Sequence, residues 1–164
     1  SKAEYKVFKP LRKGAECKMF MGEYQHSIDP KGRIIIPARF REELGTDYVL
    51  ARGLDRCLFA YTLEAWKVLT EKLAQIPFTN AEMRSFNRHF FGGASPAEVD
   101  KQGRSLIPPN LRDYAGLNKD IVIIGVSSRF EIWDKDAWNK YSEAAAESYE
   151  ANAEKLTGFD LGIV

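Results

Sequence analysis

The chain contains one sequence unit twice. Residues 29–41 (DPKGRIIIPARFR) are matched 71 residues later by residues 100–112 (DKQGRSLIPPNLR), with the shared pattern Asp-x-x-Gly-Arg-x-x-Ile-Pro and a closing arginine. After one inserted residue the match resumes, so that Trp66 aligns with Trp138. Agreement at so many spaced positions is not expected by chance. The repeat therefore predicts two copies of one structural unit.

Each copy has local signals for strands, a tight turn and short helices. The Asp side chain starts the turn, and its glycine accepts a positive φ. Pro37 suits the first turn of a helix that Gly45 ends, and Thr62 is a suitable N-cap for the next helix. The elements expected in the first copy are strands at 20–28, 33–36, 48–51 and 57–61, turns at 29–32 and 53–56, and helices from 37 to 44 and after Thr62.

The second copy repeats this order and adds helical segments, which together predict an α+β fold. Asp134 is the expected N-cap of the last helix. The further elements are a turn at 100–103, a helix from 108, strands at 121–125 and 130–133, a helix at 80–91 ending at Gly92-Gly93, and a long helix from 136 to about 156.

Composition excludes several classes of protein. The longest apolar run has six residues, far fewer than the ~20 of a membrane helix, and no secretory signal is visible. Cys17 and Cys57 form no disulfide framework, which indicates a reducing cytoplasm. His26 and His89 do not have metal-ligand spacing, so we expect no metal and no cofactor.

The charge is unevenly distributed along the chain. Its net charge is +1, but residues 1–18 carry +4, residues 19–92 carry +1 and residues 93–164 carry −4. A single copy of the chain is therefore expected to bind a polyanion weakly through charge alone.

The repeated turns are the candidate binding sites. Each presents cations beside a glycine at the tip of a β-ribbon, a shape that fits the major groove of DNA. These cations are Lys31 and Arg33 in the first turn, and Lys101 and Arg104 in the second. The alternative is that Asp29 pairs with Arg33, and Asp100 with Arg104, closing each turn without an outside partner.

From Gly22 onward the chain resembles the bacterial MraZ family. The repeated motif carries the resemblance, together with the segments 19–24 (MFMGEY) and 54–59 (LDRCLF). The resemblance implies tandem, pseudo-symmetric swapped-hairpin β-barrel units of the SpoVT-AbrB type with flanking helices. The implied divisions are 1–18, an extension or cloning remnant; 19–66, the first unit; 67–93, a helical connection; 94–138, the second unit; and 139–164, a C-terminal helix and tail.

The resemblance also implies a function. Members of the family are sequence-specific DNA-binding transcriptional regulators of the division and cell-wall gene cluster, and repression is favoured over activation. They act on promoter repeats as ring-like homo-oligomers associated with the nucleoid. By position, Arg33 and Arg104 are the principal DNA contacts, with Lys31 and Lys101 beside them. The second copy is less basic because Gln102 and Asn110 replace cations, so the first copy is the stronger candidate.

Two other functional classes compete with this interpretation, an enzyme and a protein-binding scaffold. The symmetric carboxylates Asp29 and Asp100 each stand beside an arginine, which lowers a carboxyl pKa and does not suit acid–base catalysis. No catalytic motif or small-molecule site is recognisable, so an enzyme is not expected. A non-catalytic scaffold that binds a protein partner is the other alternative. It rests on the acidic positions Glu143, Glu147, Glu150 and Glu154.

Several apolar residues have a simpler explanation in packing. Phe86, Phe90 and Phe91 have helical spacing and are expected to pack rather than stack on bases. Cys57 is expected to be a small core residue, and Trp66 and Trp138 to share a core role.

Overall fold

A computed structural model describes residues 19–159 of the chain. The expectations for residues 1–18 and for the last five residues of the tail lie outside this range. The elements in chain order are β1 (Phe20–Ser27), β2 (Arg33–Ile35), α1 (Ala38–Leu44), β3 (Asp47–Arg52), β4 (Leu58–Thr62), α2 (Leu63–Ala74), α3 (Ala81–Gly93), β5 (Ser95–Glu98), β6 (Arg104–Leu106), α4 (Pro109–Tyr114), β7 (Asp120–Ser127), β8 (Arg129–Asp134), α5 (Lys135–Glu154) and a final 3₁₀ turn (Thr157–Phe159).

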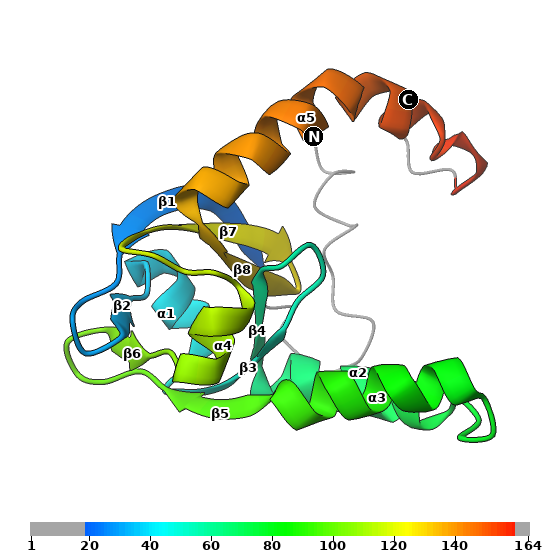
Figure 1. The fold of residues 1–164 in the computed structure, drawn as a ribbon, viewed down its shortest axis with the longest axis horizontal. Coiled ribbons are helices and arrows are strands. Elements are labelled where there is room, and N and C mark those ends of the chain that lie inside the picture. Colours follow the sequence, from blue (N-terminus) through cyan, green and yellow to red (C-terminus); the bar gives the residue numbers. More distant parts are fainter. Residues whose placement is uncertain (1–18, 160–164) are drawn as a thin grey trace, which may run out of the picture.

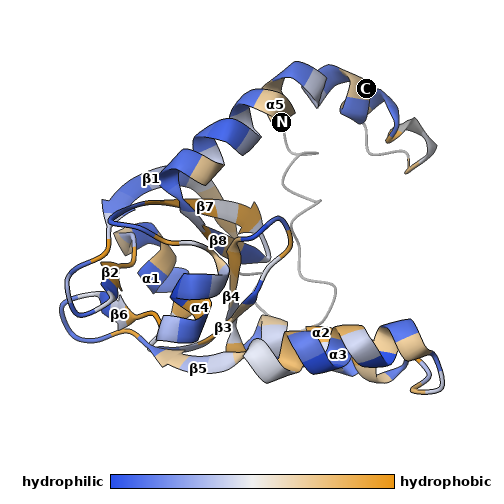
Figure 2. Ribbon diagram, viewed as in Figure 1, coloured by the Kyte–Doolittle hydropathy of each residue, from blue (hydrophilic) through white to orange (hydrophobic). Residues whose placement is uncertain are grey.

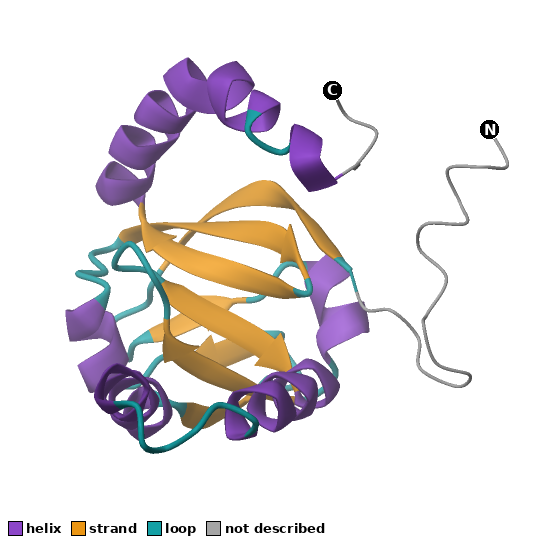
Figure 3. Ribbon diagram, turned by 90° about the vertical axis from the view of Figure 1, so that its right-hand side faces the viewer, coloured by secondary structure: helices purple, strands orange, loops and turns teal. Residues whose placement is uncertain are grey.

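The fold is α+β, with an antiparallel sheet to which both copies of the repeat contribute. The strand order is β1-β7-β8-β4-β3-β5, and β2 and β6 form a separate two-stranded ribbon. The strands lie at the centre of the body with the helices around them (Figure 3). The β2–β6 ribbon occupies one edge, α2 and α3 extend side by side from the body, and α5 projects away from it (Figure 1).

The two copies interlock at the ribbon. The Ile36 N–H donates to the Gly103 carbonyl (2.9 Å), and the Ile107 N–H donates to the Gly32 carbonyl (2.9 Å). Each copy therefore fixes the turn of the other. Ile36 and Ile107 are fully buried in a core cluster to which both copies contribute. Hydrophobic residues concentrate in the central strands, whereas the loops at the ribbon are hydrophilic (Figure 2).

The helix starts follow the expected capping chemistry. The Thr62 side chain accepts from the Ala65 N–H (3.0 Å), and the Asp134 side chain accepts from the Ala137 N–H (3.2 Å). Gly45 follows α1 at a φ of 77°. These expectations are confirmed because capping depends on residues close together in sequence.

Strand β5 has no clear sequence signal. Pro96 lies within it and cannot donate to a ladder, which argues against a strand in a sheet interior. The structure places β5 at the edge of the six-stranded sheet, beside β3, where a proline is tolerated.

The expected packing roles are confirmed. Phe86 stacks on Phe90 with ring centroids 5.4 Å apart, and Trp66 lies against both Phe90 (5.5 Å) and Phe91 (5.7 Å). Trp66 and Trp138 pack against the same smaller core cluster.

Cys57 belongs to that cluster and is fully buried. Its Sγ donates to the Leu54 carbonyl (3.1 Å), and burial raises the pKa of the thiol. The expectation of a small core residue is confirmed.

None of the helices in the described part of the chain combines the length and apolar character that a membrane crossing requires.

The interlock generates a prediction about stability. The Tyr48 hydroxyl and the Ser105 hydroxyl lie 2.6 Å apart in the core, joining the two copies. Tyr48→Phe leaves the Ser105 hydroxyl buried without its partner, and we expect a loss of about 1–3 kcal/mol in the free energy of unfolding. Denaturant titration of Tyr48→Phe, Ser105→Ala and the double variant measures the coupling. The double variant is expected to lose less than the sum of the single losses; strictly additive losses contradict the assignment.

Candidate nucleic-acid interface

The first turn is organised by one carboxylate. Asp29 Oδ1 accepts from the backbone N–H groups of Lys31 and Arg33, both at 2.9 Å. Asp29 Oδ2 accepts from Arg33 Nε at 2.6 Å. A further backbone bond, from the Gly32 N–H to the Asp29 carbonyl (2.9 Å), closes the turn. Asp29 therefore holds the guanidinium of Arg33 at its Nε side, here called the inner edge, and the terminal nitrogens form the outer edge.

The second turn repeats this geometry. Asp100 Oδ1 accepts from the backbone N–H groups of Gln102 and Arg104 at 2.9 Å, and Asp100 Oδ2 accepts from Arg104 Nε at 2.9 Å. The two turns therefore present their arginines in the same way.

The turns differ at the outer edge of the arginine. Arg104 Nη2 also donates to the side-chain oxygen of Gln102, the residue that replaces Lys31. In the part of the chain that the structure describes, the terminal nitrogens of Arg33 have no such partner. The first turn therefore leaves more donors available to a ligand.

The ion pairs form, yet the cations of both turns remain accessible to solvent. The Asp29–Arg33 and Asp100–Arg104 ion pairs are formed, as the simpler interpretation expected. However, the arginine side chains remain 28% and 33% exposed, and Lys31 and Lys101 are exposed. The pairs orient the guanidinium groups without sealing them from solvent.

The ribbon places the two arginines on one face. In the antiparallel pairing of β2 with β6, Arg33 is opposite Leu106, and Ile35 is opposite Arg104. Diagonal neighbours of this kind lie about 7–8 Å apart. Ile35 (49% exposed) and Leu106 (55% exposed) share the face with the arginines. The arginines also line one open groove between the ribbon and strands β3 and β5. The face can offer guanidinium groups and apolar contacts together.

The carboxylates are not poised for catalysis. The pKa of Asp29 lies below its ordinary value mainly because its carboxylate accepts the backbone N–H of Arg33, with the Arg33 side chain adding to the effect. The pKa of Asp100 is lowered for the same reasons by Arg104. The expected lowering of both carboxyl pKa values is confirmed, but the hydrogen bond from the backbone N–H lowers each pKa more than the charge of the neighbouring arginine does.

Two functional candidates were missed in the sequence. The guanidinium of Arg112, on α4, lies against Gly32 of the first turn, and that of Arg41, on α1, lies against Gly103 of the second turn. Arg41 and Arg112 are the last residues of the two matched segments, and this shared position is the feature of the sequence that could have singled them out. Their approach to the other copy's turn depends on the interlock, so local sequence could not reveal it.

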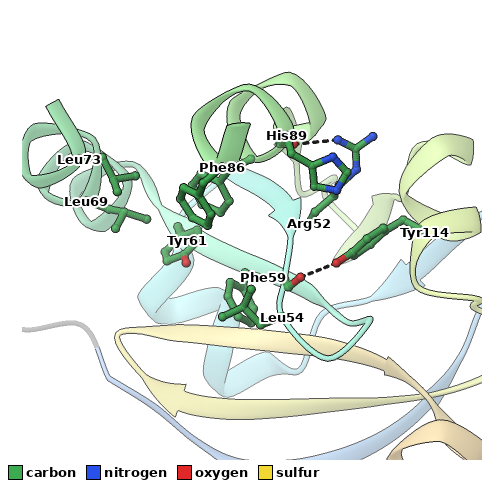
Figure 4. A pocket seen from close by; sticks show the side chains of 11 residues that line it. Arg52, Leu54, Phe59, Tyr61, Leu69, Leu73, Phe86, His89 and Tyr114 are labelled. Carbon is green, nitrogen blue, oxygen red and sulfur yellow. Dashed lines mark hydrogen bonds between the residues drawn. The ribbon is translucent and has the colours of Figure 1, made fainter. Parts of the chain in front are cut away.

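A separate hollow of about 610 Å³, counting space open to solvent, lies beside α2 and α3 (Figure 4). Leucines and aromatic rings form most of its wall, and Arg52 Nη1 donates across its rim to the His89 carbonyl (2.8 Å). None of its lining residues is an acid, a serine or a cysteine. Its lining therefore supplies no carboxylate, serine hydroxyl or thiol.

No cluster of three or more His, Cys, Asp or Glu side chains within residues 19–159 is arranged to hold a metal ion.

Comparison with known proteins finds a matching family and several similar sequences. The model of the MraZ protein family matches the chain twice, at residues 19–89 and 90–160. A protein of Heliobacterium modesticaldum called "Transcriptional regulator MraZ" is 60% identical over 143 residues, covering 87% of this chain and all of that protein. Proteins of the same name from Pelotomaculum thermopropionicum and Moorella thermoacetica are 62% and 54% identical, covering 88% and 87% of this chain and all of their own length.

The lowered pKa values predict how the turns respond to acid. A carboxylate with a depressed pKa stabilises the folded turn above its unfolded pKa, and this contribution is lost as pH falls through the folded pKa. We expect the amide NMR shifts of Gly32 and Gly103 to stay constant from pH 8 down to pH 5 and to titrate with midpoints below 3.8. Midpoints above 3.8 would contradict the assignment of Asp29 and Asp100 as ionised turn anchors.

Proposed function

Since the chain belongs to the MraZ family of transcriptional regulators, we propose that it binds duplex DNA in a sequence-specific manner through the tips of its β2–β6 ribbon. Arg33 and Arg104 are the principal contacts in this proposal, with Lys31 and Lys101 beside them. By resemblance, the target is a set of promoter repeats in the division and cell-wall gene cluster, and the effect is repression.

One observation carries the DNA-binding proposal. The two arginines project from one face of a two-stranded ribbon, and each is oriented by its own carboxylate. A two-stranded ribbon fits the major groove, and an arginine forms bidentate hydrogen bonds with a guanine edge or a phosphate. Fixing the guanidinium before binding reduces the entropy lost when DNA is contacted.

We further propose a ring-like homo-oligomer. Helix α5 has 20 residues, corresponds to about 30 Å, and has no buried residue. Tyr141 (44% exposed) and Tyr149 (74% exposed) lie on it. The start of α5 packs on the body through Trp138 and Tyr141, which lie against Trp133. However, most helical stability in a protein comes from burying one face, and α5 buries no residue fully. A second copy covering α5 explains these exposed rings, and a head-to-tail contact of this kind closes into a ring when the rotation allows.

We also propose for this chain the domain architecture that the family resemblance implies. Within the α+β fold, we propose two swapped-hairpin barrel units of the SpoVT-AbrB type, with the divisions 19–66 and 94–138 joined by 67–93 and followed by 139–164. The reciprocal hydrogen bonds between the two turns support this view. The proposed location is the cytoplasm, in association with the nucleoid.

A scaffold that binds a protein partner is the second candidate. The acidic surface of α5 favours it, since all four of its candidate residues are exposed: Glu143, Glu147, Glu150 and Glu154. The turns argue for DNA instead, because cations held outward at two equivalent tips suit a polyanion. Neither candidate requires catalysis.

The DNA contacts are tested by charge-neutral variants. We expect Arg33→Gln to weaken binding to the promoter fragment upstream of this coding region by at least about tenfold, because glutamine cannot form a charge-assisted hydrogen bond. We expect a smaller effect for Arg104→Gln, since Gln102 already occupies one nitrogen of Arg104. Fluorescence anisotropy measures both. Arg88→Gln, at an exposed site on α3, is the matched control. Wild-type affinity in both tip variants would favour the scaffold.

Multivalency is tested by varying the number of promoter repeats. Several protomers facing several repeats gain affinity through effective concentration, without new contacts. We expect affinity to rise steeply from duplexes with one repeat to those with two, three and four, and native mass spectrometry of the free protein to show a closed oligomer. Equal affinity for all four duplexes, or a monomeric mass, would refute this part of the proposal.

A further inference from the structure

We propose that Arg41 and Arg112 grip DNA phosphates, so that each DNA-binding tip is a composite of both copies. Arg112 from the second copy completes the first turn, and Arg41 from the first copy completes the second. This inference rests on the proposed DNA-binding function and extends it to two residues outside the turns.

The position of Arg112 is set by a glycine. Gly32 has a φ of +83° and is buried, and a Cβ added there would come within 2.8 Å of both Cζ and Nη1 of Arg112. The guanidinium therefore lies directly against the backbone of the first turn. A side chain at position 32 would displace it.

Arg41 is placed in the same way at the other tip. Gly103 has a φ of +80°, and a Cβ added there would lie 2.7 Å from Cζ of Arg41. Two reciprocal contacts of this kind indicate a feature of the interlocked fold and not an accident of one side chain.

These guanidinium groups lack protein partners. Among residues 19–159, neither the Arg41 nor the Arg112 side chain forms a hydrogen bond or an ion pair, and Arg112 Nε is enclosed without an acceptor. A half-buried cation without a partner is costly, and such groups in native proteins call for an explanation. The terminal nitrogens of both guanidinium groups are not enclosed in this way, so an anion supplied by a ligand can reach them and act as the acceptor.

A phosphate suits the position and chemistry of both arginines. Each turn carries a lysine and an arginine and has a second arginine against its glycine. These cations are Lys31, Arg33 and Arg112 at the first turn, and Lys101, Arg104 and Arg41 at the second. Guanidinium binds phosphate in bidentate fashion. Most protein–DNA hydrogen bonds go to the backbone and fix orientation, leaving other side chains to read bases. We assign the first role to Arg41 and Arg112.

The helix that carries Arg112 is firmly anchored. The hydroxyl of Tyr114, at the end of α4, donates to the Gly53 carbonyl (2.6 Å; Figure 4). Arg52 and Arg56 lie over the Tyr114 ring, with Cζ at 5.8 and 5.5 Å from its centroid. These contacts tie the end of α4, two residues after Arg112, to the segment that follows β3.

Salt dependence separates a phosphate contact from a packing role. Binding of the full chain is measured by anisotropy at KCl concentrations from about 50 to about 300 mM, a range over which phosphate contacts change affinity strongly. The probes are the upstream promoter fragment and a mixed-sequence duplex of equal length. The variants are Arg112→Gln, Arg41→Gln and Arg112→Lys, with Arg88→Gln as the control and thermal unfolding as the check of folding. Arg33→Gln and Arg104→Gln are measured in parallel.

We expect Arg112→Gln and Arg41→Gln to weaken binding about tenfold on both duplexes and to reduce the slope of log affinity against log salt by about one for each arginine replaced. Arg112→Lys is expected to keep the slope because it keeps the charge. If Arg112→Gln does not fold, Arg41→Gln decides by the same criterion.

The composite tip would be overturned if Arg112→Gln and Arg41→Gln had the same affinities and slopes as Arg88→Gln while Arg33→Gln bound DNA more weakly. That result would leave the DNA-binding function standing. Wild-type binding by Arg33→Gln and Arg104→Gln would overturn the function itself.

Discussion

The structure depends on a reciprocal exchange between the two copies of the repeat. The residue directly after each ribbon strand donates a backbone hydrogen bond to the glycine carbonyl of the other turn, Ile36 to Gly103 and Ile107 to Gly32. A lone hairpin is at best marginally stable in water, so neither turn could hold a fixed shape by itself. The exchange buries both isoleucines in one core and turns two short motifs into a single rigid edge.

That rigid edge explains how one side chain serves two purposes. Asp29 uses one carboxylate oxygen to close the turn and the other to hold Arg33 by Nε, and Asp100 does the same for Arg104. An exposed ion pair of this kind contributes little to stability. Its value lies in aiming the guanidinium outward while the outer nitrogens stay available. In the proposed function the ion pair and the DNA contact are therefore parts of one arrangement, and at the second tip Gln102 occupies one of the outer nitrogens of the arginine.

Sequence predicted what depends on neighbouring residues. The turns, the Thr62 and Asp134 caps, the buried Cys57 and the repeat itself all follow from patterns within a few residues or from direct comparison of segments. It did not predict the pairing of β1 with β7, or the contacts of Arg41 and Arg112 with the opposite turns, because these depend on which distant segments meet. Periodicity shows which face of a strand is buried but not which strand lies beside it.

In the proposed function, DNA lies against the β2–β6 ribbon. A cryo-EM reconstruction of the protein bound to its own upstream promoter fragment tests it most directly. The account predicts duplex density along this ribbon, with the side chains of Arg33 and Arg104 reaching into a groove or onto its phosphates. Duplex density along α5 or the α2–α3 pair, with both ribbon tips facing solvent, would contradict it.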